Sequence, residues 1–165
     1  MGAPNRILYQ FLSLPRFAQI KSELYRHRHS KIPNAQKTAA EIDLENFCKT
    51  LDGRPCKIVD ETVDGKRIIL CGTQQALESL YNAETVFMDG NFKIASPLYK
   101  QLYLFLSPSG TGKVHPRLFC FLPDKSFDTY SRMLLLIKNA AYSKGGEIRP
   151  TRFMIDYESA VKKAL

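Results

Sequence analysis

The chain has 165 residues, of which 44% are hydrophobic and 24% are charged, a composition that suits one domain with a sizeable core and excludes a disordered chain. Its 24 Lys and Arg residues against 16 Asp and Glu give a net charge of +8, which favours polyanionic partners without separating nucleic acid from a membrane surface. No apolar run approaches the roughly 20 residues that span a bilayer, and the N-terminus makes a poor signal peptide. We therefore expect neither membrane insertion nor secretion.

The four cysteines, Cys48, Cys56, Cys71 and Cys120, do not show the two-to-four-residue spacing of zinc ligands. Cys71 and Cys120 lie in apolar runs. Reduced, buried cysteines in an intracellular protein are the simplest interpretation.

A basic leader, residues 1–38, precedes the predicted domain at residues 39–165. We expect a short helix around residues 17–26 within this leader, which is otherwise exposed or disordered. Its cations, which are candidates for contacts with a nucleic-acid backbone, are Arg16, Lys21, Arg26, Arg28, Lys31 and Lys37. A solvated basic arm explains the same pattern. The pair His27 and His29 has no cysteine partners nearby, so no metal site is predicted there.

Two short apolar runs at residues 57–59 and 66–70 flank the turn signal Asp64-Gly65, which predicts a hairpin. Thr73 is then suited to cap a helix that ends near Asn82.

The second half of the chain alternates strands with helices. Residues 85–92, 99–107 and 115–123 are expected to form three antiparallel strands. A helix capped by Ser126 follows and ends at Gly145-Gly146. The remaining elements are a strand at residues 152–155, which stops at Asp156, and the start of a helix at residues 158–165. This order predicts an α/β fold with a mixed sheet, in which a right-handed crossover places Asp156 near the middle of the sheet.

The segment SPSGTGK at residues 107–113 is faintly similar to a phosphate-binding loop. It lacks the G-x-x-x-x-G-K-[ST] spacing, and no helix is evident after it. We interpret it as a flexible hairpin loop.

Asp89 and Asp156 interrupt apolar strand sequences. An unpaired buried carboxylate costs several kcal/mol, so each should be paired or bound to a metal. Two strands of one sheet can bring these acids together, and Mg²⁺ or Mn²⁺ would relieve their repulsion and support phosphoryl transfer. Two other interpretations remain open: Asp89-Gly90 is a common hairpin turn, and Asp156 is an ordinary N-cap for the helix after it.

Several short motifs follow one another in order: ETVFMDGNFK at 84–93, Pro97, Gln101-Leu102-Tyr103, Pro116, FLPDKS at 121–126 with Thr129-Tyr130, and IDYESA at 155–160. In this order they resemble the Mutator-like-element (MULE) transposase domain, in the form associated with FLYWCH-type zinc finger proteins. The resemblance covers roughly residues 25–165. Each motif alone is weak, whereas all of them in the same order are quite specific.

The resemblance implies an RNase H-like fold with a three-carboxylate, two-metal site that acts on DNA. Asp89 would be the first catalytic and metal-binding acid and Asp156 the second, with Mg²⁺ or Mn²⁺ as cofactor. The third acid lies downstream in the family and has no counterpart before Leu165. We therefore expect a domain truncated at its C-terminus, inactive alone and located in the nucleus, whose open sheet is covered by self-association or by a protein partner.

Two alternatives are kept beside this expectation. One is a domesticated DNA- or protein-binding module with vestigial acids, which the basic leader favours. The other is an unrelated small α/β domain in which Asp89 occupies a turn.

Overall fold

The computed structural model describes residues 17–31, 36–91, 95–156 and 158–165. The chain divides into two compact units, Met1–Gln36 and Lys37–Leu165. The first contains the helix α1 (Phe17–Lys31). It begins where predicted but continues beyond the expected end at residue 26, through polar residues, to Lys31. No helix among the described residues is long and apolar enough to cross a membrane.

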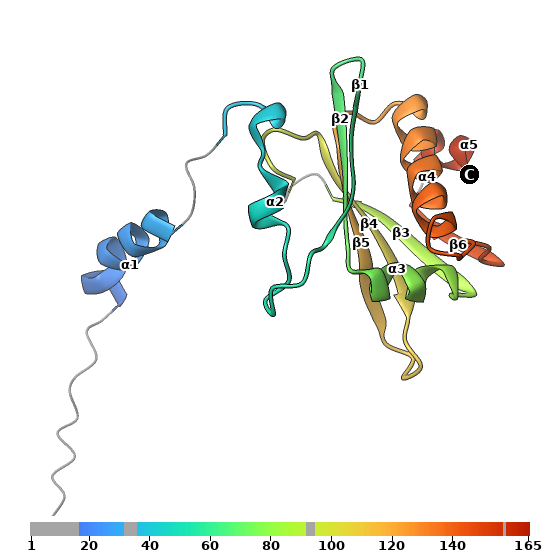
Figure 1. Cartoon of the computed structure of the whole chain (residues 1–165), viewed down its shortest axis with the longest axis horizontal. Coiled ribbons are helices and arrows are strands. Elements are labelled where there is room, and N and C mark those ends of the chain that lie inside the picture. Colours follow the sequence, from blue (N-terminus) through green and yellow to red (C-terminus); the bar gives the residue numbers. More distant parts are fainter. Residues whose placement is uncertain (1–16, 32–35, 92–94, 157) are drawn as a thin grey trace, which may run out of the picture. The chain divides into compact units, whose positions relative to one another are not determined.

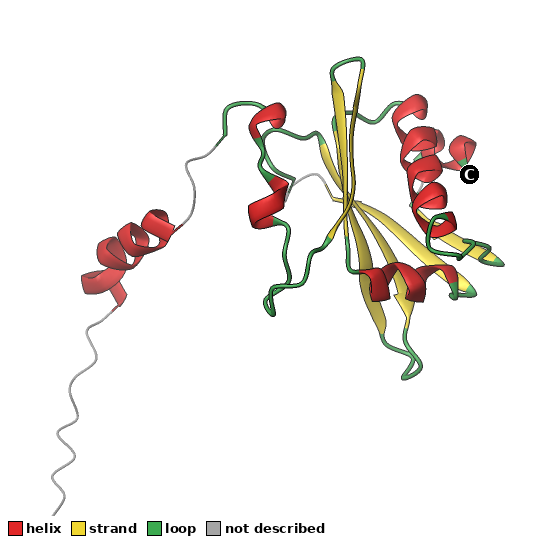
Figure 2. Ribbon diagram, in the orientation of Figure 1, coloured by secondary structure: helices red, strands yellow, loops and turns green. Residues whose placement is uncertain are grey.

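The described part of the second unit contains a mixed six-stranded sheet in the order β1-β2-β5-β4-β3-β6 (Figure 2). The strands are β1 (Lys57–Val63), β2 (Lys66–Cys71), β3 (Thr85–Asn91), β4 (Gln101–Pro108), β5 (Val114–Leu122) and β6 (Arg152–Ile155). Neighbouring strands are antiparallel except β3 and β6, which run parallel. The predicted α/β class with a mixed sheet is confirmed.

The predicted hairpin is β1 and β2, which turn at Asp64 and Gly65 with positive φ angles of 52° and 73°. Such angles at both central residues favour a tight two-residue turn, and the Asp-Gly pair tolerates them. The sequence does not indicate where this hairpin packs. In the structure Ile69 pairs with Phe121, which adds the hairpin to the edge of the β3–β5 meander.

The segment at residues 107–113 is a hairpin loop, as predicted. The N–H of Ser109 donates to the carbonyl of Lys113 at 2.7 Å, and the chain continues directly into β5. A phosphate-binding loop requires a helix at that point.

Two helices begin at N-cap residues whose side chains accept a hydrogen bond from a backbone N–H of the first turn. Thr73 Oγ1 accepts from the N–H of Ala76 at the start of α3 (Gln74–Tyr81), and Ser126 Oγ accepts from the N–H of Thr129 at the start of α4 (Phe127–Tyr142). Such bonds satisfy amides that have no partner inside the helix. Both predicted caps are confirmed, and α3 ends at its C-cap Asn82, as expected.

The main core lies between one face of the sheet and the helices α3, α4 and α5 (Ser159–Ala164) (Figure 1). Its fully buried side chains include Leu70, Leu118, Tyr130, Met133 and Val161. The inner face of α4 contributes Tyr130, Ile137 and Ala141, which are buried, and Leu134, which packs against the core.

The other face of the sheet is only partly covered. The 3₁₀ helix η1 (Ala39–Glu41) and the short helix α2 (Leu44–Phe47) lie on this side (Figure 1). On this face Phe119 and Met154 remain 40% and 50% exposed. This agrees with the expectation of apolar sheet surface left open.

The position of β6 corrects one expectation. The strand that ends at Asp156 was predicted near the middle of the sheet, yet β6 is the edge strand beyond β3 among the described residues. The hairpin β1–β2 extends the sheet at its other side instead, which moves its centre to β5 and β4. The pairing of β6 with β3 is nevertheless parallel, as the crossover through α4 requires.

Asp124 organises the start of α4. Its Oδ1 accepts from the N–H of Ser126 (3.0 Å) and from the hydroxyls of Ser126 (2.7 Å) and Thr129 (2.6 Å), and Lys66 Nζ lies 2.7 Å from Oδ2. Burial alone would raise the pKa of Asp124, but the hydrogen bonds from Lys66, Thr129 and Ser126 outweigh it and hold that pKa well below its usual range. The ionised carboxylate is therefore part of the folded structure.

Asp124→Ala is expected to lower the free energy of unfolding by about 2 kcal/mol at neutral pH, because several bonds to an ionised group are lost. The folded pKa lies below the unfolded value of about 3.9, so this stabilisation is present above that pH and is lost as the pH falls below it. Urea unfolding at pH 7 and at acid pH measures the difference between the two proteins, which should shrink on acidification. The control Asp128→Ala removes an exposed carboxylate of the same turn and should have less than half the effect.

Candidate functional site

Asp89 lies inside β3, not in a turn. It pairs with Leu104 of β4, and Gly90 pairs with Tyr103. The interpretation of Asp89-Gly90 as a hairpin turn is therefore wrong. The side chain of Asp89 is exposed, whereas Met88 before it is buried in the core, as the alternation of side chains along a strand requires.

Asp156 follows the last residue of β6. In the parallel ladder between β3 and β6 the last pair is Met88 and Ile155, and Asp89 and Asp156 are the next residues after it along the chain. Adjacent strands lie about 4.8 Å apart. The two acids are therefore neighbours near the carboxyl ends of two parallel strands, and both are exposed.

Asp156 is not the N-cap of the following helix. The cap position of α5 is Glu158, whose side chain makes no capping bond, and the carbonyl of Asp156 accepts from the N–H of Glu158 at 2.7 Å. The N-cap interpretation of Asp156 is wrong because two further residues precede the first helical turn. The side chain of Asp156 is thus available for another role.

The negative charges of these acids act on a buried tyrosine, Tyr103. Burial raises the pKa of the Tyr103 phenol first, and the negative charges of Glu158, Asp156 and Asp89 raise it further. The phenol therefore stays neutral at any physiological pH. The sequence placed Tyr103 in a motif but did not indicate that the charges of both aspartates and of Glu158 act on its phenol.

A second layer of polar side chains supports the site from the core. The hydroxyl of Tyr130 lies 2.7 Å from Gln101 Oε1 and 2.9 Å from Glu158 Oε2. A phenol has one proton and donates to only one acceptor at a time, so Gln101 and Glu158 compete for it. Gln101 is fully buried, and its Nε2 has no partner. This network ties α4 to β4 and to the start of α5.

Gly90 makes room for this layer. A Cβ at this position would overlap Gln101 Nε2 and would come within 3.2 Å of the ring of Tyr103. Glycine in a strand commonly marks such a close approach. The Asp-Gly pair thus places a carboxylate on one face of β3 and a space for buried polar groups on the other.

The acid pair suits a hard cation bound weakly. No group of three or more His, Cys, Asp or Glu side chains among the described residues is placed to hold a metal ion. Mg²⁺ is, however, often bound through one or two carboxylates, with waters and substrate phosphates as its other ligands. Asp89 and Asp156 fit such a site, which a phosphate-bearing substrate would complete.

The predicted nucleic-acid contacts divide between the two units. Lys21, Arg26 and Arg28 are exposed along α1, and Lys21 Nζ lies 5.9 Å from the ring centroid of Tyr25. Arg16 and the side chain of Lys31 lie outside the described residues. Lys37, which the sequence groups with the leader, belongs to the second unit, where its N–H donates to Glu41 Oε2 at 2.9 Å.

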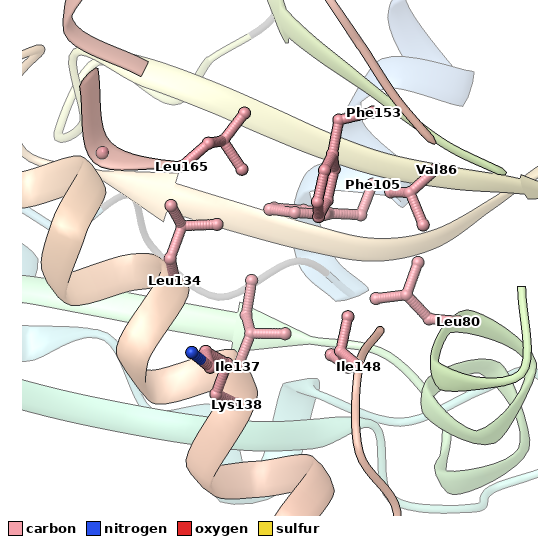
Figure 3. Close-up of a pocket in the computed structure, with 10 residues that line it drawn as sticks. Leu80, Val86, Phe105, Leu134, Ile137, Lys138, Ile148, Phe153 and Leu165 are labelled. Carbon is pink, nitrogen blue, oxygen red and sulfur yellow. The ribbon is translucent and has the colours of Figure 1, made fainter. Parts of the chain in front are cut away.

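An apolar pocket between the sheet, α4 and the C-terminal residues is a weaker candidate. It encloses about 170 Å³, and Figure 3 shows aliphatic and aromatic side chains around it, with Lys138 as its charged member. Phe105, Leu134 and Phe153 are among the lining residues. The lining offers no acid, nucleophile or hydrogen-bonding pair that would hold a reacting group, so we regard it as a packing gap.

Comparison of the chain with protein-family models, with curated proteins and with solved structures finds no match. Function must therefore be argued from the site itself.

Proposed function

We propose that residues 37–165 form part of an RNase H-like catalytic domain of the MULE transposase type, in which Asp89 and Asp156 contribute two acids of a site for DNA phosphodiesters. The observation that carries the proposal is the position of the two acids, on neighbouring parallel strands at the register after Met88 and Ile155. The strand order β5-β4-β3-β6, antiparallel and then parallel, also supports it. The sequence motifs that resemble this family supply the same two residues.

The chain's own groups would act mainly by position and charge. Asp89 and Asp156 present carboxylate oxygens to solvent, where they would hold Mg²⁺ or Mn²⁺ against a DNA phosphate. When bound, the ion supplies Lewis-acid stabilisation of the phosphate and activates a water or a 3′-hydroxyl. The Tyr130 network ties the start of α5 to β4, and neither it nor the neutral Tyr103 phenol adds positive charge that would compete with the ion.

The same geometry indicates low activity for the chain alone. Phosphoryl transfer in this class of site uses a pair of ions, and Asp89 with Asp156 offers ligands for a weak site only. Glu158, the nearest further carboxylate, is engaged by the hydroxyl of Tyr130. We infer weak metal binding without efficient DNA cleavage. Mg²⁺-dependent nicking of duplex DNA that Asp89→Ala abolishes would contradict this inference.

Paramagnetic line broadening by Mn²⁺ tests the proposed site. Amide signals near Asp89 and Asp156 should broaden first, because the ion binds between them, and the effect should disappear in both Asp89→Asn and Asp156→Asn. The turn at Asp64 carries another exposed carboxylate and serves as the internal control. Equal broadening at Asp64 and at the acid pair would indicate unspecific binding and would count against the proposal.

The exposed basic helix α1 favours a second candidate function, a DNA-binding module in which the acids are vestigial. In that case the affinity of the full chain for duplex DNA should fall steeply between about 50 and 200 mM salt, because phosphate contacts release counterions. The double variant Arg26→Ala/Arg28→Ala should reduce the salt slope by about 2, one per lost contact. Affinity that does not change with salt would exclude this function.

A further inference from the structure

Three cysteines that are far apart in the sequence meet at one place. Cys48 Sγ lies 3.1 Å from Cys56 Sγ and 3.2 Å from Cys71 Sγ. All three are free thiols, with Cys48 buried and the other two partly buried. The sequence spacing gave no sign of this cluster, because its members come from the segment after α2, the approach to β1 and the end of β2.

Backbone pairing holds the three cysteines together. Lys49 and Pro55 form an antiparallel bridge, and the N–H of Cys56 donates to the carbonyl of Cys48 at 2.9 Å. On the other side, Cys71 pairs with Lys57, the residue after Cys56. The cluster is therefore part of the ladder, and Cys48 is the member that contacts both of the others.

The cluster suits sulfur–sulfur chemistry rather than a closed metal site. A closed Zn²⁺ site has four ligands, whereas three thiols meet here, and no group of three or more His, Cys, Asp or Glu side chains among the described residues is placed to hold a metal ion. A disulfide bond is about 2.05 Å long, so either pair needs to close by only about 1 Å. Cys48 and Cys56 face each other across the antiparallel bridge, and residues in such a hydrogen-bonded pair have Cα atoms about 5.5 Å apart, within the disulfide range. For Cys48 and Cys71 the short sulfur–sulfur separation is the supporting observation.

We propose that Cys48 is the shared partner of two alternative disulfides, one with Cys56 and one with Cys71, which form by exchange with a small-molecule disulfide such as oxidised glutathione. One protein thiolate attacks a sulfur of the oxidant, which forms a mixed disulfide and releases one glutathione thiolate. A second protein thiol, as its thiolate, then attacks the protein sulfur and releases the other glutathione. Two protein thiols are oxidised, and one glutathione disulfide is reduced to two thiols.

The third cysteine makes the two bonds interchangeable. In the Cys48–Cys56 form, the thiolate of Cys71 is placed to attack the sulfur of Cys48 and release Cys56 as a thiolate. This step moves the bond without net oxidation. Cys120 takes no part, because it is fully buried within the core cluster with α3 and α4, and its neighbour in the ladder is Leu70 rather than Cys71.

Burial and the charges around the cluster set the rate at which its thiols are oxidised. Burial raises the pKa of Cys48 to about 11 and that of Cys56 to about 11, while Lys57 lowers the former slightly. Burial, Cys56 and Asp60 raise the pKa of Cys71. Because the thiolate is the attacking species, oxidation is slow at neutral pH and becomes faster as the pH rises toward 11.

The Cys48–Cys71 bond would have a structural effect. Cys71, Phe119, Leu104 and Asp89 pair in sequence across β2, β5, β4 and β3, so Cys71 lies three strands, or about 14 Å, from Asp89 on the same row of the sheet. A bond from Cys48 to Cys71 would fasten the segment that carries α2 to this partly open face. The bond from Cys48 to Cys56 would close only a local loop and would leave that segment less restrained.

The test uses the full chain treated with oxidised glutathione at about pH 8.5, quenched with a thiol-alkylating reagent and mapped by peptide mass spectrometry. The native chain should lose two thiols and give both Cys48–Cys56 and Cys48–Cys71 peptides. Cys56→Ser should give the second bond alone, and Cys71→Ser the first alone. Cys48→Ser should slow intrachain disulfide formation at least tenfold, whereas the matched control Cys120→Ser should leave it unchanged.

Three results would overturn the proposal. The first is that the native chain keeps all four thiols under conditions that oxidise a simple dithiol. The second is that Cys48→Ser forms a Cys56–Cys71 bond at the native rate. The third is that stoichiometric Zn²⁺ protects the three thiols in the untreated protein. The mapping of the native chain needs no substitution, so it remains decisive even where a variant folds poorly.

Discussion

Gly72→Ala is expected to lower the free energy of unfolding of the second unit by about 3 kcal/mol, at the upper end of the range for overpacking. Gly72 lies between the end of β2 and the cap of α3. A Cβ there would lie 2.6 Å from the carbonyl oxygen of Arg117 and 2.7 Å from a methyl carbon of Leu118. The first of these atoms is backbone in β5, so relief requires that a strand of the central sheet moves. Urea unfolding followed by circular dichroism measures the loss.

The matched control is Gly110→Ala in the loop between β4 and β5. No atom lies within 4 Å of a Cβ at that position, and its φ is not positive. This variant should unfold within about 0.5 kcal/mol of the native chain. If Gly72→Ala were equally mild, the close packing of the β2–α3 junction against β5 would be wrong.

Arg67→Ala is expected to lower the free energy of unfolding by about 3 kcal/mol, as for the loss of one partner from a largely buried pair. Arg67 Nε and Nη2 donate to the two carboxylate oxygens of Asp60, both at 2.7 Å. Its Nη1 and Nη2 also donate to the carbonyls of Ala39 and Ile42. The side chain is only 12% exposed. Its removal therefore leaves the Asp60 carboxylate and the two carbonyls without this hydrogen-bond donor. Hydrogen exchange should increase around η1 and in the segment up to Cys48.

Two further variants show whether burial and geometry, or charge alone, account for the stability lost in Arg67→Ala. Arg54→Ala removes an ion pair with Asp52 whose side chains are 62% and 57% exposed, and such a solvent-exposed pair contributes little to stability. Arg67→Lys keeps the charge but loses the planar, two-pronged contact. It should therefore recover less than half of the stability that Arg67→Ala loses. An Arg67→Lys variant as stable as the native chain would mean that charge alone holds this segment.

Local signals in the sequence predicted the elements well. Thr73 and Ser126 bond amides three residues ahead of them, and Asp64-Gly65 adopts the left-handed angles that a two-residue turn requires. Each of these features depends only on a few adjacent residues. The antiparallel meander and the parallel β6 also followed, because short loops and a helical crossover leave few topologies.

Contacts between distant segments were not predictable in the same way. Nothing near residues 57–71 indicates that the hairpin pairs with β5, and this addition moves the centre of the sheet to β5 and β4, away from β6. The thiol cluster depends on three segments at once, so the spacing of its cysteines carried no signal. The bond from Tyr130 to Glu158 was also missed, because Glu158 was interpreted only as the first residue of a helix.

The candidate acids show both what the sequence could predict and what it could not. Their apolar sequence contexts singled out Asp89 and Asp156, and the resemblance to transposase motifs gave them roles, which stay predictions. The register between β3 and β6, which the sequence does not contain, makes them neighbours. The supporting layer of Gln101 and Tyr130 follows from Gly90, whose missing Cβ leaves space beneath β3.

The most direct test of the central claim is a double-mutant cycle for Mn²⁺ binding, measured by calorimetry on the native chain, Asp89→Asn, Asp156→Asn and the double variant. If the two acids hold one ion, each single change should weaken binding at least tenfold, and the double change should weaken it no further, because coupled residues are not additive. Asp64→Asn, which changes an exposed carboxylate in the β1–β2 turn, is the matched control and should bind as the native chain does. Losses that simply add, or native affinity in Asp156→Asn, would show that the two aspartates do not share a site.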